Sequence, residues 1–177
     1  MEHKIIFGGP VGAGKTTAIA AISDIPVVAT EARPTDETRS LKATTTVAMD
    51  YGVLHLAGGA KVHLYGTPGQ ERFSFMWDIL AVGGIGFVLL LDDTRPDPLA
   101  DLEFYLDSFK GLIANSAVVI GLNRTENKPH PRLYTYQTRL AKLNLNVPLF
   151  EVDPRRREDV KVLLLALLAM LDPGVQR

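Results

Sequence analysis

Eight residues near the start of the chain have the spacing of a phosphate-binding loop. Residues 9–16 fit the pattern G-x-x-x-x-G-K-[ST] at every fixed position. Glycines in such a loop let the backbone turn its N–H groups inward around an anion, and the positive end of a following helix adds to the attraction. We expect Lys15 to reach the outer phosphates of a nucleotide and the Thr16 hydroxyl to bind Mg²⁺. The residues expected to hold the phosphates are Gly9, Pro10, Val11, Gly12, Ala13, Gly14, Lys15, Thr16 and Thr17.

The flanking segments have the character that this loop requires. Residues 4–7 are mostly apolar and predict a short strand, and residues 17–22 are good helix formers. A glycine-rich turn with an incidental lysine is the alternative interpretation. The strand before the loop and the helix after it favour nucleotide binding instead.

Composition narrows the class of protein. The 177 residues carry a net charge of −1, with 46% hydrophobic and 22% charged residues, which predicts one soluble globular domain over residues 1–177. There is no strongly basic surface for nucleic acid. The absence of cysteine excludes disulfides, thiolate metal sites and a cysteine nucleophile. The first residues resemble no targeting signal, and the longest apolar run, 162–171, is about half a membrane span. We therefore expect a cytoplasmic protein without a membrane anchor of its own.

The rest of the chain alternates strands and helices, which predicts an α/β fold. Two runs on either side of Gly58-Gly59 predict an antiparallel hairpin. The expected architecture is a three-layer sandwich around a six-stranded, mostly parallel sheet with one antiparallel edge strand. The two runs of the hairpin are 53–56 and 61–65, and residues 44–51 run into the first of them. Further strands are expected at 86–91, 117–122 and 147–152, and helices at 17–22, 73–82, 98–114, 131–143 and 153–171.

Three segments allow more than one interpretation. The polar segment 29–46 is either a functional loop or disordered. His55 and His63 on the hairpin are expected to be surface residues, since no third metal ligand presents itself. Residues 155–157 are three arginines, which we interpret as the solvated first turn of the last helix, with Asp153 as its cap.

Further polar motifs follow the predicted strands, where ligands bind in doubly wound sheets. One is Gly66-Thr67-Pro68-Gly69-Gln70-Glu71-Arg72-Phe73, and the other is Asn123-Arg124-Thr125-Glu126. Together with residues 9–16, these motifs resemble those of small Ras-like GTPases in order and spacing, over nearly the whole chain. The Ras-like G domain is a P-loop NTPase fold.

The resemblance implies a role for each motif. Thr46 is similar to the switch I threonine that closes on Mg²⁺ and the γ-phosphate. The Gly69 N–H would sense the γ-phosphate, and Gln70 would orient the attacking water. Asn123, Arg124 and Glu126 stand where the family reads guanine, and Val152 with Asp153 stands where a loop covers the base.

The sequence departs from the family at two positions. Gly66 replaces an Asp that supports Mg²⁺, so we expect water with Thr16 and Thr46 to hold the metal, with Asp50 or Asp92 as substitutes. Glu126 replaces an Asp but keeps the carboxylate that accepts two guanine N–H groups. Because adenine lacks that donor pair, GTP is favoured over ATP. The Thr-Pro-Gly-Gln segment also resembles bacterial MglA-like GTPases and the GTP-binding proteins encoded beside Roadblock-type proteins.

The resemblance implies slow hydrolysis of GTP to GDP with Mg²⁺, and a nucleotide-dependent switch acting on a protein partner. Expected partners are an activating or effector protein of the Roadblock type, with a homodimer as a further arrangement. No stabilising arginine stands out, although Arg33, Arg39 and Arg72 lie in or near the expected switch segments. Aromatic residues around Trp77 form either an effector surface or core. The alternatives to a GTPase switch are a catalytically weak nucleotide-binding scaffold and an ATP-specific P-loop NTPase.

Overall fold

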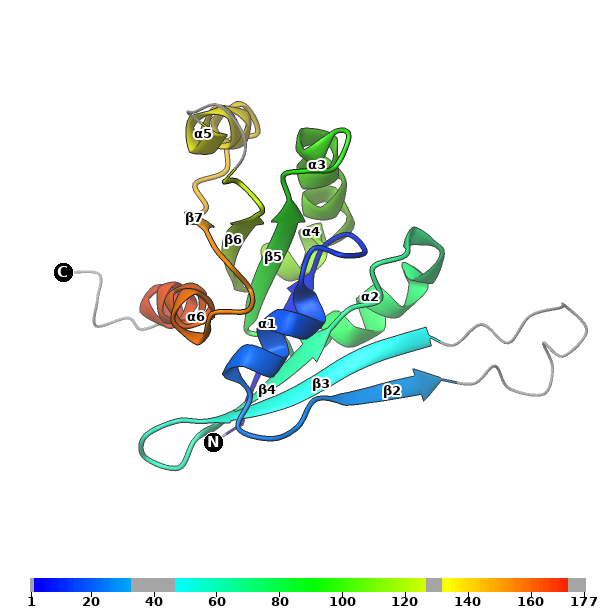
Figure 1. Ribbon diagram of the computed structural model, residues 1–177, viewed down its shortest axis with the longest axis vertical. Helices are drawn as coiled ribbons and strands as arrows, with labels where there is room; N and C mark the ends of the chain where they lie inside the picture. The colour runs from blue at the N-terminus through cyan, green and yellow to red at the C-terminus, as the bar shows by residue number, and fades with distance from the viewer. Residues whose placement is uncertain (1, 33–46, 127–131, 172–177) are drawn as a thin grey trace, which may run out of the picture.

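The computed structural model describes residues 2–32, 47–126 and 132–171, which form one sheet flanked by helices (Figure 1). Within these residues, seven strands lie in the order β2-β3-β4-β1-β5-β6-β7. Their bounds are β1 (Glu2–Gly8), β2 (Val28–Ala32), β3 (Val47–His55), β4 (Lys61–Gly66), β5 (Gly86–Asp92), β6 (Ala117–Asn123) and β7 (Leu149–Glu151). The helices are α1 (Lys15–Ile22), η2 (Glu71–Phe73), α2 (Phe75–Ala81), α3 (Pro98–Ser108), α4 (Lys110–Ile113), α5 (Arg132–Lys142) and α6 (Arg157–Leu171).

The sheet confirms the predicted α/β class. The strands β4, β1, β5, β6 and β7 are parallel neighbours, while β3 pairs antiparallel with β4 as the hairpin predicts. That residues 1–177 form a single domain stays a prediction.

The strand count of six and the edge position of the antiparallel strand were wrong. Residues 28–32, which we assigned partly to a polar loop, form β2 and pair antiparallel with β3 on its outer side. Backbone hydrogen bonds to β3 hold this strand, so its polar sequence did not reveal it. An edge strand pairs through its backbone on one side only and leaves the other row of N–H and C=O groups unpaired. The antiparallel strand β3 is therefore second from the edge.

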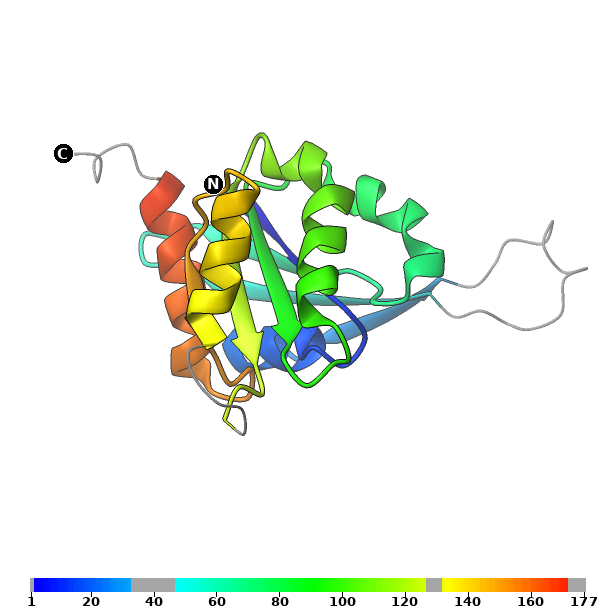
Figure 2. The ribbon, with the colours of Figure 1, turned by 90° about the horizontal axis from the view of Figure 1, so that it is seen from above.

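Two apolar layers cover the two faces of the sheet (Figures 1 and 2). On one face α1 and α6 pack over one hydrophobic cluster, and on the other α2, α3, α4 and α5 pack over a second. All seven residues of β5 are buried. That continuous burial is the reason its sequence reads as an unbroken apolar run. The layers leave the carboxyl ends of the parallel strands open for the loops that form the site.

Two helices differ from their predicted bounds. The predicted helix 98–114 is divided at Phe109, whose ring packs on Trp77 and Phe87 with centroids 5.2 and 4.5 Å away. The last helix begins at Arg157, because residues 153–156 form a turn in which the Arg156 N–H donates to the Asp153 carbonyl. Asp153 therefore lies before the helix and does not cap it.

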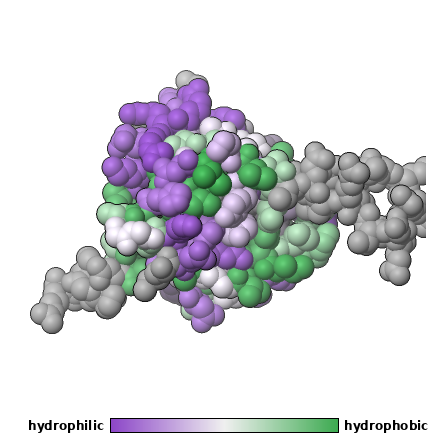
Figure 3. All heavy atoms as spheres, turned by 90° about the horizontal axis from the view of Figure 1, so that it is seen from below, coloured by the Kyte–Doolittle hydropathy of each residue, from purple (hydrophilic) through white to green (hydrophobic). Residues whose placement is uncertain are grey.

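The face of the molecule seen from below presents both hydrophilic and hydrophobic residues (Figure 3). Of the aromatic residues that we considered for an effector surface, Phe73 and Trp77 lie in the core, while Phe75 is 60% exposed on α2. Ile79 and Val82 are also exposed on or just after that helix. Among the described residues, no helix is long and apolar enough to cross a membrane.

Candidate nucleotide site

The glycine-rich loop lies between β1 and α1, and its backbone needs glycine at defined positions. Gly9, Gly12 and Gly14 have φ angles of 135°, 80° and 105°, which side chains disfavour. A Cβ on Gly9 would also lie 2.0 Å from the carbonyl oxygen of Leu90, and one on Gly14 would lie 2.7 Å from Pro154 Cγ. The loop is thus packed closely against β5 and against the loop after β7.

Lys15 points back into this loop. Its Nζ donates to the carbonyl oxygens of Gly9 and Pro10 at 2.6 and 2.8 Å. Burial lowers the pKa of Lys15 to about 8, partly offset by the carboxylate of Asp50 and reinforced by Arg95. A buried ammonium with few strong acceptors favours an anionic ligand, because a phosphate would restore its charge stabilisation.

The segment after β4 lies directly on the loop. A Cβ on Gly69 would come within 2.7 Å of Val11 N and 2.9 Å of Lys15 Nζ. The Tyr105 hydroxyl on α3 donates to the Gly69 carbonyl at 3.2 Å. Gln70 follows at the start of η2 and is exposed. The structure therefore places Gly69 beside Lys15, with Gln70 next to it at the surface.

The motif after β6 meets the loop from the other side. Asn123 Nδ2 donates to the Ala13 carbonyl at 3.1 Å, and Arg124 donates to the Gly12 carbonyl at 3.0 Å while pairing with Asp92. These contacts border a pocket of about 490 Å³, a size suited to a small organic ligand. It is lined by Gly12, Gly14, Lys15, Thr16, Thr17, Asn123, Arg124, Glu126, Asp153, Pro154 and Arg155.

The loop after β7 forms the far wall of this pocket. Arg155 makes a bidentate pair with Asp153, with Nε–Oδ1 and NH2–Oδ2 distances of 2.9 and 2.7 Å. These hydrogen bonds hold the pKa of Asp153 at about 2. Arg157 donates to the carbonyls of Ala21 and Ile22 at the end of α1. All three arginines of 155–157 are exposed, as expected, but only Arg157 belongs to the last helix, and Arg155 and Arg157 also make specific contacts.

The position expected for a metal brings together residues from three elements. The Thr16 hydroxyl donates to the Asp50 carboxylate, and Asp50 on β3 lies directly opposite Gly66 on β4. A Cβ on Gly66 would be 3.2 Å from Asp50 Oδ2. The carboxylate of Asp50 thus occupies the space next to Thr16 that a side chain at position 66 would enter. Asp92 instead bonds Thr94 and Arg124.

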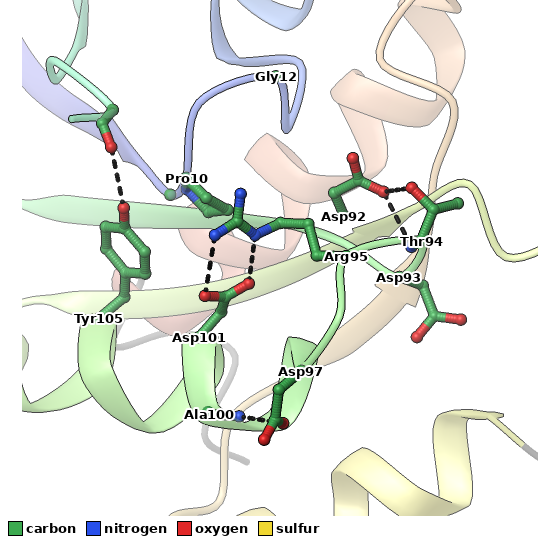
Figure 4. A network of polar contacts seen from close by, with 12 residues as sticks. Pro10, Gly12, Asp92, Asp93, Thr94, Arg95, Asp97, Ala100, Asp101 and Tyr105 are labelled. Carbon is green, nitrogen blue, oxygen red and sulfur yellow. Dashed lines mark hydrogen bonds and ion pairs between the residues drawn. The ribbon is translucent and has the colours of Figure 1, made fainter. Parts of the chain in front are cut away.

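Acidic residues of the loop after β5 also contribute to the surroundings of the site, and of these only Asp92 was expected from the sequence. This loop lies under the phosphate-binding loop (Figure 4), where Arg95 is near Pro10 and pairs with Asp101. Buried Asp93 accepts hydrogen bonds from Arg132 and Tyr136 on α5. Asp93 and Arg95 follow a buried parallel strand closely, and that position in the sequence could have indicated that they lie near the site.

Most of the residues that the sequence predicted for the site line the pocket or border it. Val152 is buried in the core rather than facing the pocket. Thr46, Arg33 and Arg39 lie outside the described residues. His55 bonds Asp24 and His63 bonds Tyr51, and no group of acidic or histidine side chains suited to a metal occurs within the described ranges.

Comparisons with known proteins give a family match and three related proteins. A family described as "Conserved hypothetical ATP binding protein" matches residues 26–126. An uncharacterized protein of Methanocaldococcus jannaschii is 32% identical over 73% of this chain and 66% of its own length. Intraflagellar transport protein 22 of Chlamydomonas reinhardtii and Ras-related protein Rab-18-B of Danio rerio are 27% and 28% identical. Those two matches cover 61% and 60% of this chain, and 54% and 48% of the relatives. The chain thus spans about half to two thirds of these relatives.

Proposed function

This chain belongs to the P-loop family of conserved hypothetical ATP-binding proteins, and within that family we propose that it is a GTP-binding member. It binds GTP and slowly hydrolyses it to GDP, and it acts as a switch for a protein partner. The observation that carries the proposal is the convergence of Asn123, Arg124 and Glu126 with the phosphate-binding loop around one pocket. The similarity to a Rab-related protein supports a small GTPase. The finer subgroup that we propose is MglA-like, with a Roadblock-type partner.

Glu126 supports guanine as the base. Its exposed side chain lines the pocket, where a carboxylate can accept hydrogen bonds from guanine N1–H and the 2-amino group. Adenine offers no such donor pair, so the carboxylate would be desolvated without compensation. The family description names ATP, and an ATP-specific NTPase is therefore the second candidate.

Replacing Glu126 by Gln is expected to change the preferred base. The amide keeps one acceptor for N1–H but presents a donor to position 2, which suits the carbonyl of xanthine. We expect GDP affinity to fall about tenfold or more, while affinity for xanthosine diphosphate rises. Isothermal titration with both nucleotides measures this. Glu158→Gln, an exposed acid on α6 outside the pocket, is the matched control. An unchanged ratio of the two affinities would contradict the role of Glu126.

Thr16 and Asp50 fit the oxygen chemistry of Mg²⁺. Their contact joins a hydroxyl and a carboxylate at the loop, and Mg²⁺ is commonly held by one or two such groups together with phosphate oxygens. When bound, the metal would neutralise charge on those oxygens. We propose that Asp50 takes over the support expected from a carboxylate at position 66, with Thr46 completing the set.

Removing the charge of Asp50 is therefore expected to weaken the binding of Mg²⁺. In Asp50→Asn, the Mg²⁺ concentration that half-maximally tightens GDP binding should rise roughly ten- to a hundredfold, while metal-free GDP affinity stays similar. A magnesium titration of fluorescent GDP binding tests this. Asp107→Asn on α3 serves as the control, because Asp107 pairs only with Lys110 among the described side chains. An identical magnesium requirement in wild type and Asp50→Asn would remove Asp50 from the site.

The remaining chemistry depends on the positions of the chain's own groups. Lys15 and the loop N–H groups would stabilise charge on the outer phosphates, and Gln70 would orient the attacking water. A single-turnover assay of phosphate release from GTP and from ATP tests the proposal. Release from GTP alone supports it, and release from ATP alone favours the second candidate. Nucleotide binding without any release would leave a binding scaffold.

A further inference from the structure

The wall of the pocket at residues 153–155 offers no free backbone donor. The Asp153 N–H donates to the Asp159 carboxylate at 2.9 Å, and the Arg155 N–H donates to the Asp153 carboxylate at 3.0 Å. Pro154, between them, has no N–H. Its ring is packed against Gly14, so this part of the wall is fixed to the phosphate-binding loop. Any hydrogen bond that this wall donates to a ligand must therefore come from the Arg155 side chain.

The Arg155 guanidinium is held in place for that task. Asp153 occupies one edge, through Nε and NH2 at 2.9 and 2.7 Å. Among the described residues, no hydrogen bond is donated by Nη1, which forms the other edge together with Nη2. A guanidinium carries five N–H donors, so this second edge keeps a pair of parallel donors. Because one edge is fixed, less side-chain freedom is lost when the second edge binds.

Arg155 and Glu126 lie at the same side of the pocket. Both line it, and the Glu126 carboxylate acts electrostatically on Arg155. A negative and a positive group thus face the same region of a ligand. Arg155 is exposed over 79% of its side chain and Asp153 over 23%, so the pair lies at the rim of the pocket that both residues line.

This arrangement matches the edges of guanine. The N1–H and 2-amino donors lie beside the O6 acceptor, and N7 follows as a second acceptor. A carboxylate suits the first pair, and an arginine fork is the commonest reader of O6 and N7. Adenine carries an amino group in place of O6, and its hydrogens would face the donors of the guanidinium. Arginine at this position therefore attracts guanine and repels adenine.

We propose that Arg155, oriented by Asp153, reads O6 and N7 of guanine and is a specificity-determining residue of this site. The inference rests on the proposed function, in which the pocket holds a guanine nucleotide. It assigns Asp153 the part of a positioning residue that contacts Arg155 rather than the base.

Base analogues test this assignment with the full chain. The dissociation constants of GDP, 7-deaza-GDP, which lacks the N7 acceptor, and ADP are measured for wild type, Arg155→Met and Arg155→Lys. Wild type should bind GDP about tenfold more tightly than 7-deaza-GDP, and Arg155→Met should bind the two equally. The ratio of GDP to ADP affinity should fall about ten- to a hundredfold in Arg155→Met and by an intermediate factor in Arg155→Lys. In Asp153→Asn, the ratio of GDP to 7-deaza-GDP affinity should fall to a value between those of wild type and Arg155→Met.

The neighbouring arginine provides the matched control. Arg156 is 69% exposed and its nearest acid, Asp159, is 3.8 Å away, so Arg156→Met removes the same charge without touching the pocket. It should keep the wild-type selectivity, and thermal unfolding checks that each variant is folded. If Arg155→Met lost affinity for GDP, 7-deaza-GDP and ADP by the same factor, the effect would be one of general charge and would overturn the assignment. Wild-type selectivity in Arg155→Met would also overturn it. If wild type binds no guanine nucleotide, the proposed function itself fails, which is a distinguishable outcome.

Discussion

Lys15→Ala is expected to abolish tight nucleotide binding. The ammonium is buried at the carbonyls of Gly9 and Pro10, next to Gly69, and would face the outer phosphates. Removing one partner of a buried charge pair costs about 2–5 kcal/mol, which corresponds to roughly 30- to 5,000-fold in affinity. Fluorescence titration with labelled GDP and GTP measures the loss. The effect should be larger for GTP, since the extra phosphate adds negative charge near the same ammonium.

Lys4→Ala is the matched control for this experiment. Lys4 lies on β1, the strand before the loop, and its Nζ donates to the Val82 carbonyl rather than to the loop. This variant should keep wild-type affinity. If Lys15→Ala bound GTP as tightly as the control, the glycine-rich loop would not be the phosphate site, despite its fit to the motif.

Gln70→Leu is expected to slow hydrolysis while leaving binding intact. Gln70 lies beside Gly69, whose backbone touches the phosphate-binding loop, so its amide can reach a water at the outer phosphate. Leucine has similar size but no polar group to orient that water. Single-turnover phosphate release should fall about a hundredfold, an effect typical of losing a positioned proton-handling group. GTP affinity should change less than about threefold, since the side chain is exposed and makes no contact that binding requires.

The control for Gln70 is Gln137→Leu, the same substitution at an exposed position on α5 far along the chain. It should hydrolyse GTP at the wild-type rate. Hydrolysis by Gln70→Leu at that same rate would mean that another group orients the water, or that the chain acts as a nucleotide-binding scaffold.

Most of the fold could be predicted from the distribution of apolar residues along the sequence. The strands β5 and β6 are buried on both faces, so their sequences are continuous apolar runs that allow little else. The missed strand β2 lacks that signal. Its pairing with β3 depends on backbone hydrogen bonds, which side-chain patterns do not report. The break at Phe109 was hidden for a related reason, since its ring packs on residues distant in sequence.

Within the candidate site, the residues that are adjacent in sequence could be predicted, and the contacts between distant segments could not. Motifs with fixed spacing, such as 9–16 and 123–126, were found from sequence because their residues are adjacent. The partner of Thr16 comes from β3, and only the antiparallel register that sets Asp50 against Gly66 brings the two together. Arg155 is exposed as expected, but the acidic residues after it, Glu158 and Asp159, gave no indication of its partner. Its actual partner, Asp153, precedes it, and the intervening Pro154 shapes the turn that joins them.

The central claim is that this pocket holds a guanine nucleotide in a magnesium-dependent manner. The most direct test compares the affinities of GDP and ADP, each with and without Mg²⁺, for the wild-type chain. We predict that GDP binds at least about tenfold more tightly than ADP, because only guanine offers the Glu126 carboxylate a pair of N–H donors. We further predict that Mg²⁺ tightens GDP binding. Tighter binding of ADP, or no binding of either nucleotide, would contradict the account.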